Sequence, residues 1–549
     1  MTVPTPPADR DATAASDTVV GTVTGPGDAA DEFEVVVPGE TDLRTGEFVV
    51  YETTVRGTRR DVLARVTNTE EERGLPGGFA SDPGVDPEQV ADALGVPTGD
   101  AELDRVTARV IGYFDDRMET FTNPRSLPNP GSRVSRAADE FLEAVIPAAD
   151  WESDAGVAHL GWLLERSPHD ANVFLPTDDL AATHVAVLAS TGSGKSYTAS
   201  VLLEEMVCPE SRAAALVFDP HGEYTTLEEV RRDEHADVFR ENGYTPDVDV
   251  IQPEEISVAI PDLNFADLLA LIDDPSSRME AVLNDAWRRV SSDANQITVD
   301  QLIEACREQD DNGSTADALS WRLRKALDTD LFTPASTRNL TDYVSPGQLT
   351  ILQLDRLRRD DQQMLAAVLL RKLYEARREA VRTNGETGLD FPLFTLLEEG
   401  HRFAPDGQAR SLGILRTILS EGRKFGFGVG IVSQRPSKLD SDVLSQCGTQ
   451  VIMQIQNPTD QQAIRDSVED AGEDVLDELP GLTPGQAVVA GDAVNTPVLV
   501  RVRERHTPHG AQSLDATSEW RSSWEQHEQE ANRGTTSAYE TEDVDERPL

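Results

Sequence analysis

The sequence predicts an α/β protein in which a small N-terminal β-barrel precedes a mainly parallel sheet that carries an inserted helical subdomain. Three observations predict this fold. Apolar runs without alternation recur between residues 184 and 502, as in strands buried on both faces of a sheet. Helical periodicity replaces them between about 263 and 345. Short alternating segments separated by turn residues fill residues 18–114 and are typical of a small barrel.

Shifts in composition predict the boundaries between these parts. A Pro-, Ala-, Thr- and Asp-rich start, a Pro-rich linker at 123–132 and an acidic end without periodicity separate the patterned regions. We expect, in order, a disordered segment over 1–17, the barrel over 18–149 with an acidic insertion near 70–103, the sheet domain over 150–506 with the helical insertion near 263–345, and an acidic disordered tail over 507–549.

Each candidate strand of the sheet domain is a short apolar segment. They are HVAVLA (184–189), AALVFD (214–219), LTILQLD (349–355), LFTLLEE (393–399), FGVGIVSQ (427–434), TQVIMQI (449–455), QAVVAG (486–491) and PVLVRV (497–502). The barrel candidates are VVGTVTG, EFEVVVP, GEFVVYETTV, DVLARVTNT and RVTARVIGYF.

The charge of the chain is strongly acidic, with 49 basic and 99 acidic residues, a net charge of −50 and only five lysines. An apolar content of 38% with clear periodicity argues against a disordered acidic protein. We therefore expect a halophile's high-salt cytoplasm, where the Debye length falls to about 3 Å and self-repulsion is screened. The acidity is then an adaptation to high salt, and it does not exclude nucleic-acid binding.

The cysteines and the hydropathy exclude other classes. Cys208, Cys306 and Cys447 lie far apart without ligand spacing, so neither a disulfide framework nor a zinc site is expected. No apolar run approaches 18 residues and the N-terminus has no apolar signal region. We expect a soluble cytoplasmic protein without a membrane segment.

The most informative segment is HVAVLASTGSGKSYTASVLLEEM, a strand, a glycine loop and a helix. This order is typical of a phosphate-binding loop. Gly192 and Gly194 let backbone N–H groups surround phosphate oxygens, Lys195 reaches the β- and γ-phosphates, and the Ser196 hydroxyl can bind Mg²⁺. Ala189 replaces the first glycine of the motif. The alternative is a chance Gly/Ser loop, against which the flanking strand and helix argue.

A pair of carboxylates, Glu398 and Glu399, ends the apolar segment at 393–399. In NTP hydrolysis one carboxylate holds Mg²⁺ through water, and another orients and deprotonates the attacking water. We assign Glu398 to the metal and Glu399 to the water. Two surface glutamates that cap a strand are the alternative interpretation.

Two polar residues flank the segment at 427–434. Gln434 ends a buried strand, where a polar side chain is costly without a partner, and is a candidate γ-phosphate sensor. Arg423 precedes the same strand and is a candidate arginine finger that reaches a neighbouring subunit's nucleotide. A solvated basic turn is the alternative for Arg423.

The loop FDPHGEY follows the segment at 214–219 and places Asp219, His221 and Glu223 beside the predicted nucleotide site. Ligands bind outside the carboxyl ends of parallel strands, so the loop is a candidate site wall. A metal site is the second interpretation, and a hydrogen-bonded loop histidine is favoured over it.

The segments HVAVLASTGSGKS, FDPHGEY, LLEEGHRFAP, SEGRKFGFGVGIVSQRPSKLDSDVLSQCGTQ and LPGLTPGQAVVAG together resemble the HerA family of DNA translocases, within the HerA–FtsK group, over roughly residues 18–505. The resemblance implies a RecA-like P-loop ATPase core. It also implies a homo-hexameric, ATP- and Mg²⁺-dependent motor or helicase on double-stranded DNA that acts with a NurA-type nuclease and the Mre11–Rad50 proteins in resecting double-strand breaks.

The family's functional residues map onto the motifs quoted above. Its nucleotide-binding loop corresponds to Thr191, Gly192, Ser193, Gly194, Lys195, Ser196 and Tyr197, its acidic pair to Glu398 and Glu399, its sensor to Gln434 and its trans-acting arginine to Arg423.

DNA contacts have to overcome the acidity of the chain, because counterion release weakens as salt rises. A closed ring retains threaded DNA by topology, so basic residues need only line the channel. Candidates are the basic residues that follow the two catalytic strands, Arg410, Arg416, Arg435 and Lys438. Ordinary surface ion pairs are the alternative for each.

Two other classes of function compete with a DNA motor. One is an ATP-switched scaffold whose hydrolysis times assembly with a partner protein. The other is a related ring motor that pumps conjugative DNA or a secreted protein, which the absence of a transmembrane segment disfavours.

Overall fold

The computed structural model describes residues 14–38, 41, 43–72, 103–115, 120–148, 156–292, 296–310, 313–468, 473–509 and 517–525. Contacts divide the chain into two units, Met1–Pro508 and His509–Leu549. Most of the expected disordered segment 1–17, of the acidic insertion near 70–103 and of the tail over 507–549 lies outside the described residues. Within the tail, residues 517–525 are helical.

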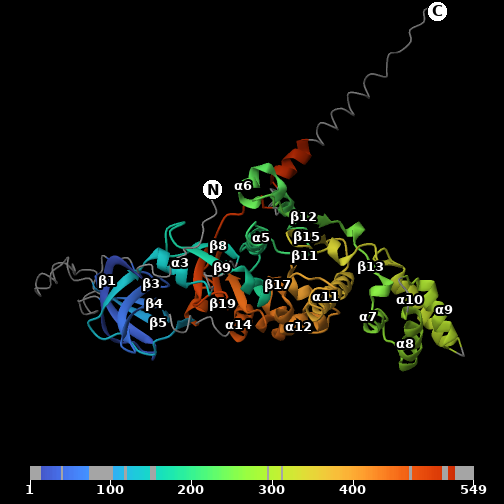
Figure 1. The fold of residues 1–549 in the computed structure, drawn as a ribbon, viewed down its shortest axis with the longest axis horizontal. Helices are drawn as coiled ribbons and strands as arrows, with labels where there is room; N and C mark the ends of the chain where they lie inside the picture. Colours follow the sequence, from blue (N-terminus) through green and yellow to red (C-terminus); the bar gives the residue numbers. More distant parts are fainter. Residues whose placement is uncertain are drawn as a thin grey trace, which may run out of the picture. The chain divides into compact units, whose positions relative to one another are not determined.

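The N-terminal strands close into a six-stranded antiparallel barrel, as the alternating segments predict (Figure 1). Its sheet runs β2-β1-β7-β3-β4-β5, and β5 pairs back with β2. Phe33, Val35 and Val37 point inward at every second position. The strands are β1 (Ala15–Pro26), β2 (Glu32–Pro38), β3 (Phe48–Val55), β4 (Thr58–Glu72), β5 (Leu103–Asp115) and β7 (Arg133–Ala137), with β6 (Thr120–Thr122) paired to β5.

The second domain contains an eleven-stranded mixed sheet in the order β12-β15-β11-β16-β17-β10-β18-β19-β20-β8-β9. The first seven strands are mutually parallel and the rest are antiparallel. The parallel strands are β12 (Asp247–Ile251), β15 (Gln348–Gln353), β11 (Ala215–Asp219), β16 (Leu393–Leu397), β17 (Phe427–Ser433), β10 (Val185–Leu188) and β18 (Thr449–Met453). The others are β19 (Gln486–Gly491), β20 (Val498–Val502), β8 (Val157–Leu163) and β9 (Asn172–Pro176).

All eight predicted strands of this sheet are confirmed, whereas β8, β9 and β12 were not predicted. Both faces of the sheet are buried. Along β10, Ala186 and Leu188 join one hydrophobic cluster, and Val185 and Val187 join the other. Burial on both faces explains why these strands are apolar without alternation.

Helices cover the two faces of this sheet (Figure 1). On one face Val201 and Leu202 of α5 are buried, and on the other Leu365 of α11 and Leu415 of α12 are buried. The helices outside the insertion are α3 (Asp139–Val145), α4 (Thr177–Ala182), α5 (Lys195–Met206), α6 (Ala236–Phe239), α11 (Arg359–Arg382), α12 (Leu412–Glu421), α13 (Ser441–Ser445), α14 (Pro458–Ser467) and α15 (Glu473–Asp477). Among the described helices, none has the length and apolarity needed to span a bilayer.

The predicted helical insertion lies between β12 and β15. Side-chain caps start three of its helices: Asn264, Ser276 and Thr298 accept from the N–H of Asp267, Met279 and Gln301, respectively. The helices are α7 (Phe265–Ala270), α8 (Ser277–Ser291), α9 (Val299–Glu308) and α10 (Ser314–Leu327). The chain enters and leaves through two short paired parallel strands, β13 (Val258–Ala259) and β14 (Phe332–Thr333).

Candidate functional site

The glycine loop joins the carboxyl end of β10 to the first turn of α5, as predicted. Gly192 and Gly194 have φ of 84° and 104°, in the left-handed region that glycine adopts without strain. A Cβ on Gly192 would meet nothing within 4 Å, whereas one on Gly194 would lie 3.2 Å from the Met453 side chain. Ala189 is buried and its φ is not left-handed, so this departure from the motif requires no glycine. The loop keeps the open cradle that a phosphate group needs.

The two polar residues that open α5 both point toward carboxylates. Lys195 is buried; its Nζ forms an ion pair with Glu398 Oε1 and lies 3.7 Å from Glu399 Oε1. The Ser196 hydroxyl donates to Glu223 Oε2. An ammonium, a hydroxyl and carboxylates therefore converge beside the loop, which is the donor set that a Mg²⁺-bound triphosphate requires.

The acidic pair follows β16, which is separated from β10 in the sheet by β17. Glu398 is fully buried, and this burial raises its pKa to about 7 against the opposing charge of Lys195. Glu399 has φ of 52°, unusual for a residue with a side chain. Its Oε2 lies 3.2 Å from His401 Nδ1. Burial acts to raise the pKa of Glu399, but the His401 contact and the Lys195 charge outweigh it and hold the pKa below its usual value.

The two carboxylates thus have different environments although they are adjacent in sequence. Glu399 is held ionised, as a base that accepts a proton from water has to be. Glu398 is enclosed with a cation on one oxygen and the Tyr224 hydroxyl, which donates to it, on the other. A divalent cation would supply the positive charge that keeps such a buried carboxylate ionised.

The loop after β11 forms a wall of the same site. Asp219 accepts backbone N–H bonds from His221 at 3.1 Å, Gly222 at 2.8 Å and Tyr224 at 3.1 Å, which fixes the turn. The turn directs Glu223 toward Ser196 and Tyr224 toward Glu398.

His221 lies in this wall as a hydrogen-bonded residue. Its Nε2 lies 3.2 Å from Arg402 Nη2. In the described part of the chain, the cluster with metal-ligand geometry is elsewhere, at Glu229, Glu234 and His235.

Gln434 contacts the glycine loop directly. Thr191 Oγ1 donates to Gln434 Oε1 at 2.6 Å. Because β17 pairs in parallel with β10, Gln434 after β17 and the glycine loop after β10 meet at the carboxyl ends of these strands. The sensor candidate is therefore in contact with the phosphate-binding segment.

Arg423 lies near the amino end of β17, whereas the candidate nucleotide site lies at the carboxyl ends of the parallel strands. It is exposed and lines a groove of about 540 Å³ beside Asp492 and Gln450. The seven residues of β17 separate it from Gln434, and at about 3.3 Å per residue they span roughly 23 Å. An arginine side chain cannot cover that distance, so Arg423 can act only on a nucleotide bound elsewhere.

Tyr197 faces a C-terminal strap, residues 503–507, that packs along α5. Its hydroxyl accepts from the Arg505 backbone N–H at 2.7 Å. In the same strap Arg503 is buried and donates to Glu205 at 2.7 Å and to Glu204 at 3.1 Å. Glu204 also accepts from the Thr507 N–H and hydroxyl. The strap therefore fixes the helix that presents the phosphate loop.

The basic candidates for DNA contacts differ in how they are engaged. Arg416 makes a bidentate bond to Asp440 at 3.1 and 2.6 Å. Arg410 donates to the Ala270 and Asp360 carbonyls at 3.0 and 3.2 Å. Both guanidinium groups are thus already held by acceptors of the chain.

The other two candidates extend toward solvent. Arg435 and Lys438 are exposed, and no ion pair in the described stretches involves either. They follow β17 on the nucleotide side of the sheet.

Comparison with known proteins identifies relatives of this chain. The family model described as the central domain of helicase HerA matches residues 158–373. The DNA double-strand break repair helicase HerA of Pyrococcus furiosus is 27% identical over 529 residues, covering 86% of this chain and 89% of that protein. The protein of the same name from Sulfolobus acidocaldarius is 26% identical over 420 residues, covering 73% and 79%.

Solved structures also resemble the chain. VirB4 of Thermoanaerobacter pseudethanolicus matches with a TM-score of 0.47 and 16% identity, covering 64% of this chain and 98% of that one. The bacterial conjugative coupling protein TrwB matches with a TM-score of 0.41 and 14% identity, covering 61% and 88%.

Proposed function

Because the chain belongs to the HerA helicase family, we propose that it is an ATP-driven motor that moves along double-stranded DNA as a homo-hexamer. The observation that carries the proposal is the convergence of Lys195, Ser196, Glu398 and Glu399 at one edge of the parallel sheet. This arrangement holds a triphosphate and a water in one place.

Each residue of the site has a role in hydrolysis. Lys195 neutralises the β- and γ-phosphates. Ser196 and Glu398 would hold Mg²⁺, which would supply further positive charge beside the phosphates. Glu399 accepts a proton from the attacking water, and His401, 3.2 Å from one of its oxygens, orients it. Gln434 reports the state of the γ-phosphate to the glycine loop through Thr191.

The position of Arg423 supports a ring. An arginine that lies a strand's length from its own site, exposed beside a groove, completes the site of a neighbouring subunit. Hydrolysis then requires two subunits for each nucleotide, and a closed ring gives every subunit both halves.

Several finer features of the function belong to the same proposal. Arg435 and Lys438 contact the DNA, since they are exposed beside the nucleotide site. A NurA-type nuclease and the Mre11–Rad50 proteins are the partners in resecting broken ends. The net charge of −50 supports a high-salt cytoplasm as the working medium.

The ATPase rate in about 2–3 M KCl, with and without linear duplex DNA, tests the proposal. We expect DNA to raise the rate of the wild-type protein. We also expect Glu399→Gln to lower it by about 10²–10⁴-fold, the usual contribution of a general base. An ATPase rate that does not change when DNA is added would instead favour an ATP-switched scaffold.

A further inference from the structure

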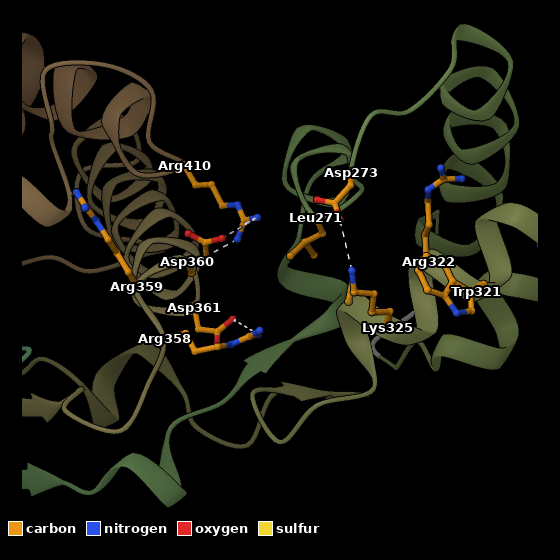
Figure 2. A pocket seen from close by; sticks show the side chains of 11 residues that line it. Leu271, Asp273, Trp321, Arg322, Lys325, Arg358, Arg359, Asp360, Asp361 and Arg410 are labelled. Atoms are coloured by element: carbon orange, nitrogen blue, oxygen red, sulfur yellow. Dashed lines mark hydrogen bonds and ion pairs between the residues drawn. The ribbon is translucent and has the colours of Figure 1, made fainter.

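A basic groove lies between the helical insertion and the sheet domain, outside the nucleotide site (Figure 2). Its volume is about 330 Å³. Five basic and three acidic residues line it, although acids outnumber bases two to one in the chain. Of the five, Arg359 directs its guanidinium away from the groove and Arg358 is paired with Asp361. One wall is α10 with Trp321, Arg322 and Lys325, and the other carries Arg358 and Arg410.

Trp321 and Lys325 on α10 are exposed, and Arg322 between them is partly buried. Trp321 is 65% exposed, more than any other large apolar side chain in the described part of residues 1–508. The Lys325 ammonium lies 5.4 Å from the centre of its ring and 3.5 Å from Asp273. An exposed aromatic ring flanked by cations matches the chemistry of a nucleic-acid strand, whose phosphates take the cations and whose sugars or bases take the ring.

The opposite wall is connected to the catalytic loop. Arg359 begins α11, and its guanidinium extends away from the groove (Figure 2) to donate to the His401 carbonyl at 3.0 Å. On the same turn Gln363 donates to the Arg402 carbonyl at 2.7 Å. A ligand in the groove would therefore lie against the helix turn that also holds the segment after Glu399.

We propose that this groove binds the phosphodiester backbone of a DNA strand, with phosphates on Arg322 and Lys325 and with Trp321 against the sugars or bases. The inference rests on the proposed function, since it adds a second contact surface to a DNA motor. It adds the helical insertion to Arg435 and Lys438 as a surface that contacts DNA.

The salt dependence of DNA affinity tests the groove. Each phosphate contact contributes about 0.9 to the slope of log affinity against log salt on duplex DNA, so Arg322→Gln/Lys325→Gln lowers that slope by about 1.8. The matched control is Arg307→Gln/Arg324→Gln, which removes the same charge from exposed arginines of the same insertion that do not line the groove. We expect the control to keep the wild-type slope. An equal effect of both variants, or no effect of either, overturns the proposal.

A substitution that is expected to strengthen DNA binding tests whether misfolding explains the weaker binding of the other variant. Asp273→Asn removes the carboxylate that competes for Lys325, so it strengthens DNA binding. Weaker or unchanged binding by this variant contradicts the groove assignment, because damage to the fold cannot increase affinity.

Tryptophan fluorescence tests whether DNA lies beside Trp321 and whether the groove prefers single-stranded or duplex DNA. DNA quenches the emission of Trp321, and Trp321→Phe abolishes that part of the signal. Stronger quenching by a single strand than by a blunt duplex identifies stacked bases, and equal quenching identifies backbone contact alone. DNA that binds without quenching Trp321 excludes the groove. A wild-type protein that neither binds DNA nor hydrolyses faster with it overturns the proposed function itself, which is a separate result.

Discussion

Replacement of Arg503 by alanine removes the cation from a buried network behind the phosphate loop. The Arg503 side chain is 6% exposed, and its partners Glu204 and Glu205 are 0% and 4% exposed. Loss of one partner from a buried ion pair costs about 3–5 kcal/mol, because the remaining charge is left without compensation. Two carboxylates depend on Arg503, so we expect a loss at the upper end of that range, about 5 kcal/mol.

The expected loss depends on pH with a defined sign. Burial raises the pKa of Glu205 above its usual value, and Arg503 opposes this shift. A carboxyl whose pKa is raised in the folded state stabilises the fold at low pH and loses that contribution as the pH rises through the folded pKa. Without Arg503 the pKa rises further. The destabilisation is then largest at neutral pH and shrinks on acidification.

Chemical unfolding followed by circular dichroism measures this loss in about 2–3 M KCl. Salt screens exposed pairs but not buried ones, so the effect persists there, whereas Arg232→Ala, which breaks the exposed pair to Glu229, changes stability by less than about 1 kcal/mol. The triple variant Arg503→Met/Glu204→Gln/Glu205→Gln recovers most of the stability. A loss below about 1 kcal/mol for Arg503→Ala, or one that grows on acidification, refutes this account of the network.

Three further results are expected. Gly194→Ala forces a side chain into a left-handed φ of 104° and toward Met453, so ATP affinity measured by calorimetry falls, whereas a conservative Ala189→Gly change leaves it near wild type. Arg423→Ala abolishes hydrolysis but keeps ATP binding. Mixing it with Glu399→Gln restores part of the rate in mixed assemblies, and no recovery on mixing counts against action between subunits. Leu415→Ala empties a buried site on α12 and costs about 2–5 kcal/mol in thermal unfolding, and a smaller cost means that the core closes around it.

In the large sheet, the sequence predicted the strands that are buried at every residue, but it missed β8 and β9 although most of their residues are buried too. β16 reads LFTLL and β17 reads FGVGIVS, and both are buried at every residue. β12 reads DVDVI and lies at the edge of the sheet, where alternating aspartates meet solvent and hide the strand. β7 reads RVSRA, and only pairing with β1 and β3 makes it a strand of the barrel. A strand at the edge of a sheet, or one that forms only through pairing with distant segments, is hard to recognise from the local pattern of apolar and polar residues.

In the candidate nucleotide site, the sequence predicted the loop conformation at residues 191–197, where one short segment carries several candidate residues. Contacts between loops were not predicted. The hydrogen bond from Tyr224 to Glu398 joins residues 174 positions apart, and Glu399, which contacts His401, has a left-handed φ. A tyrosine in a loop and a histidine after a glutamate pair carry no local sign of these contacts. The sequence also gave no sign that Asp440 would hold Arg416.

The paired strands β13 and β14 bring the two ends of the helical insertion side by side. Because Val258 pairs with Phe332, the chain leaves the sheet domain and returns to it one strand spacing apart, about 4.8 Å. A gap of that width can be closed by a short turn, without any shift of β12 or β15. Residues can therefore be added to or removed from the far end of the insertion without a change in the register of the sheet, which gives that end of the insertion a freedom to diverge that the strands around the candidate nucleotide site lack.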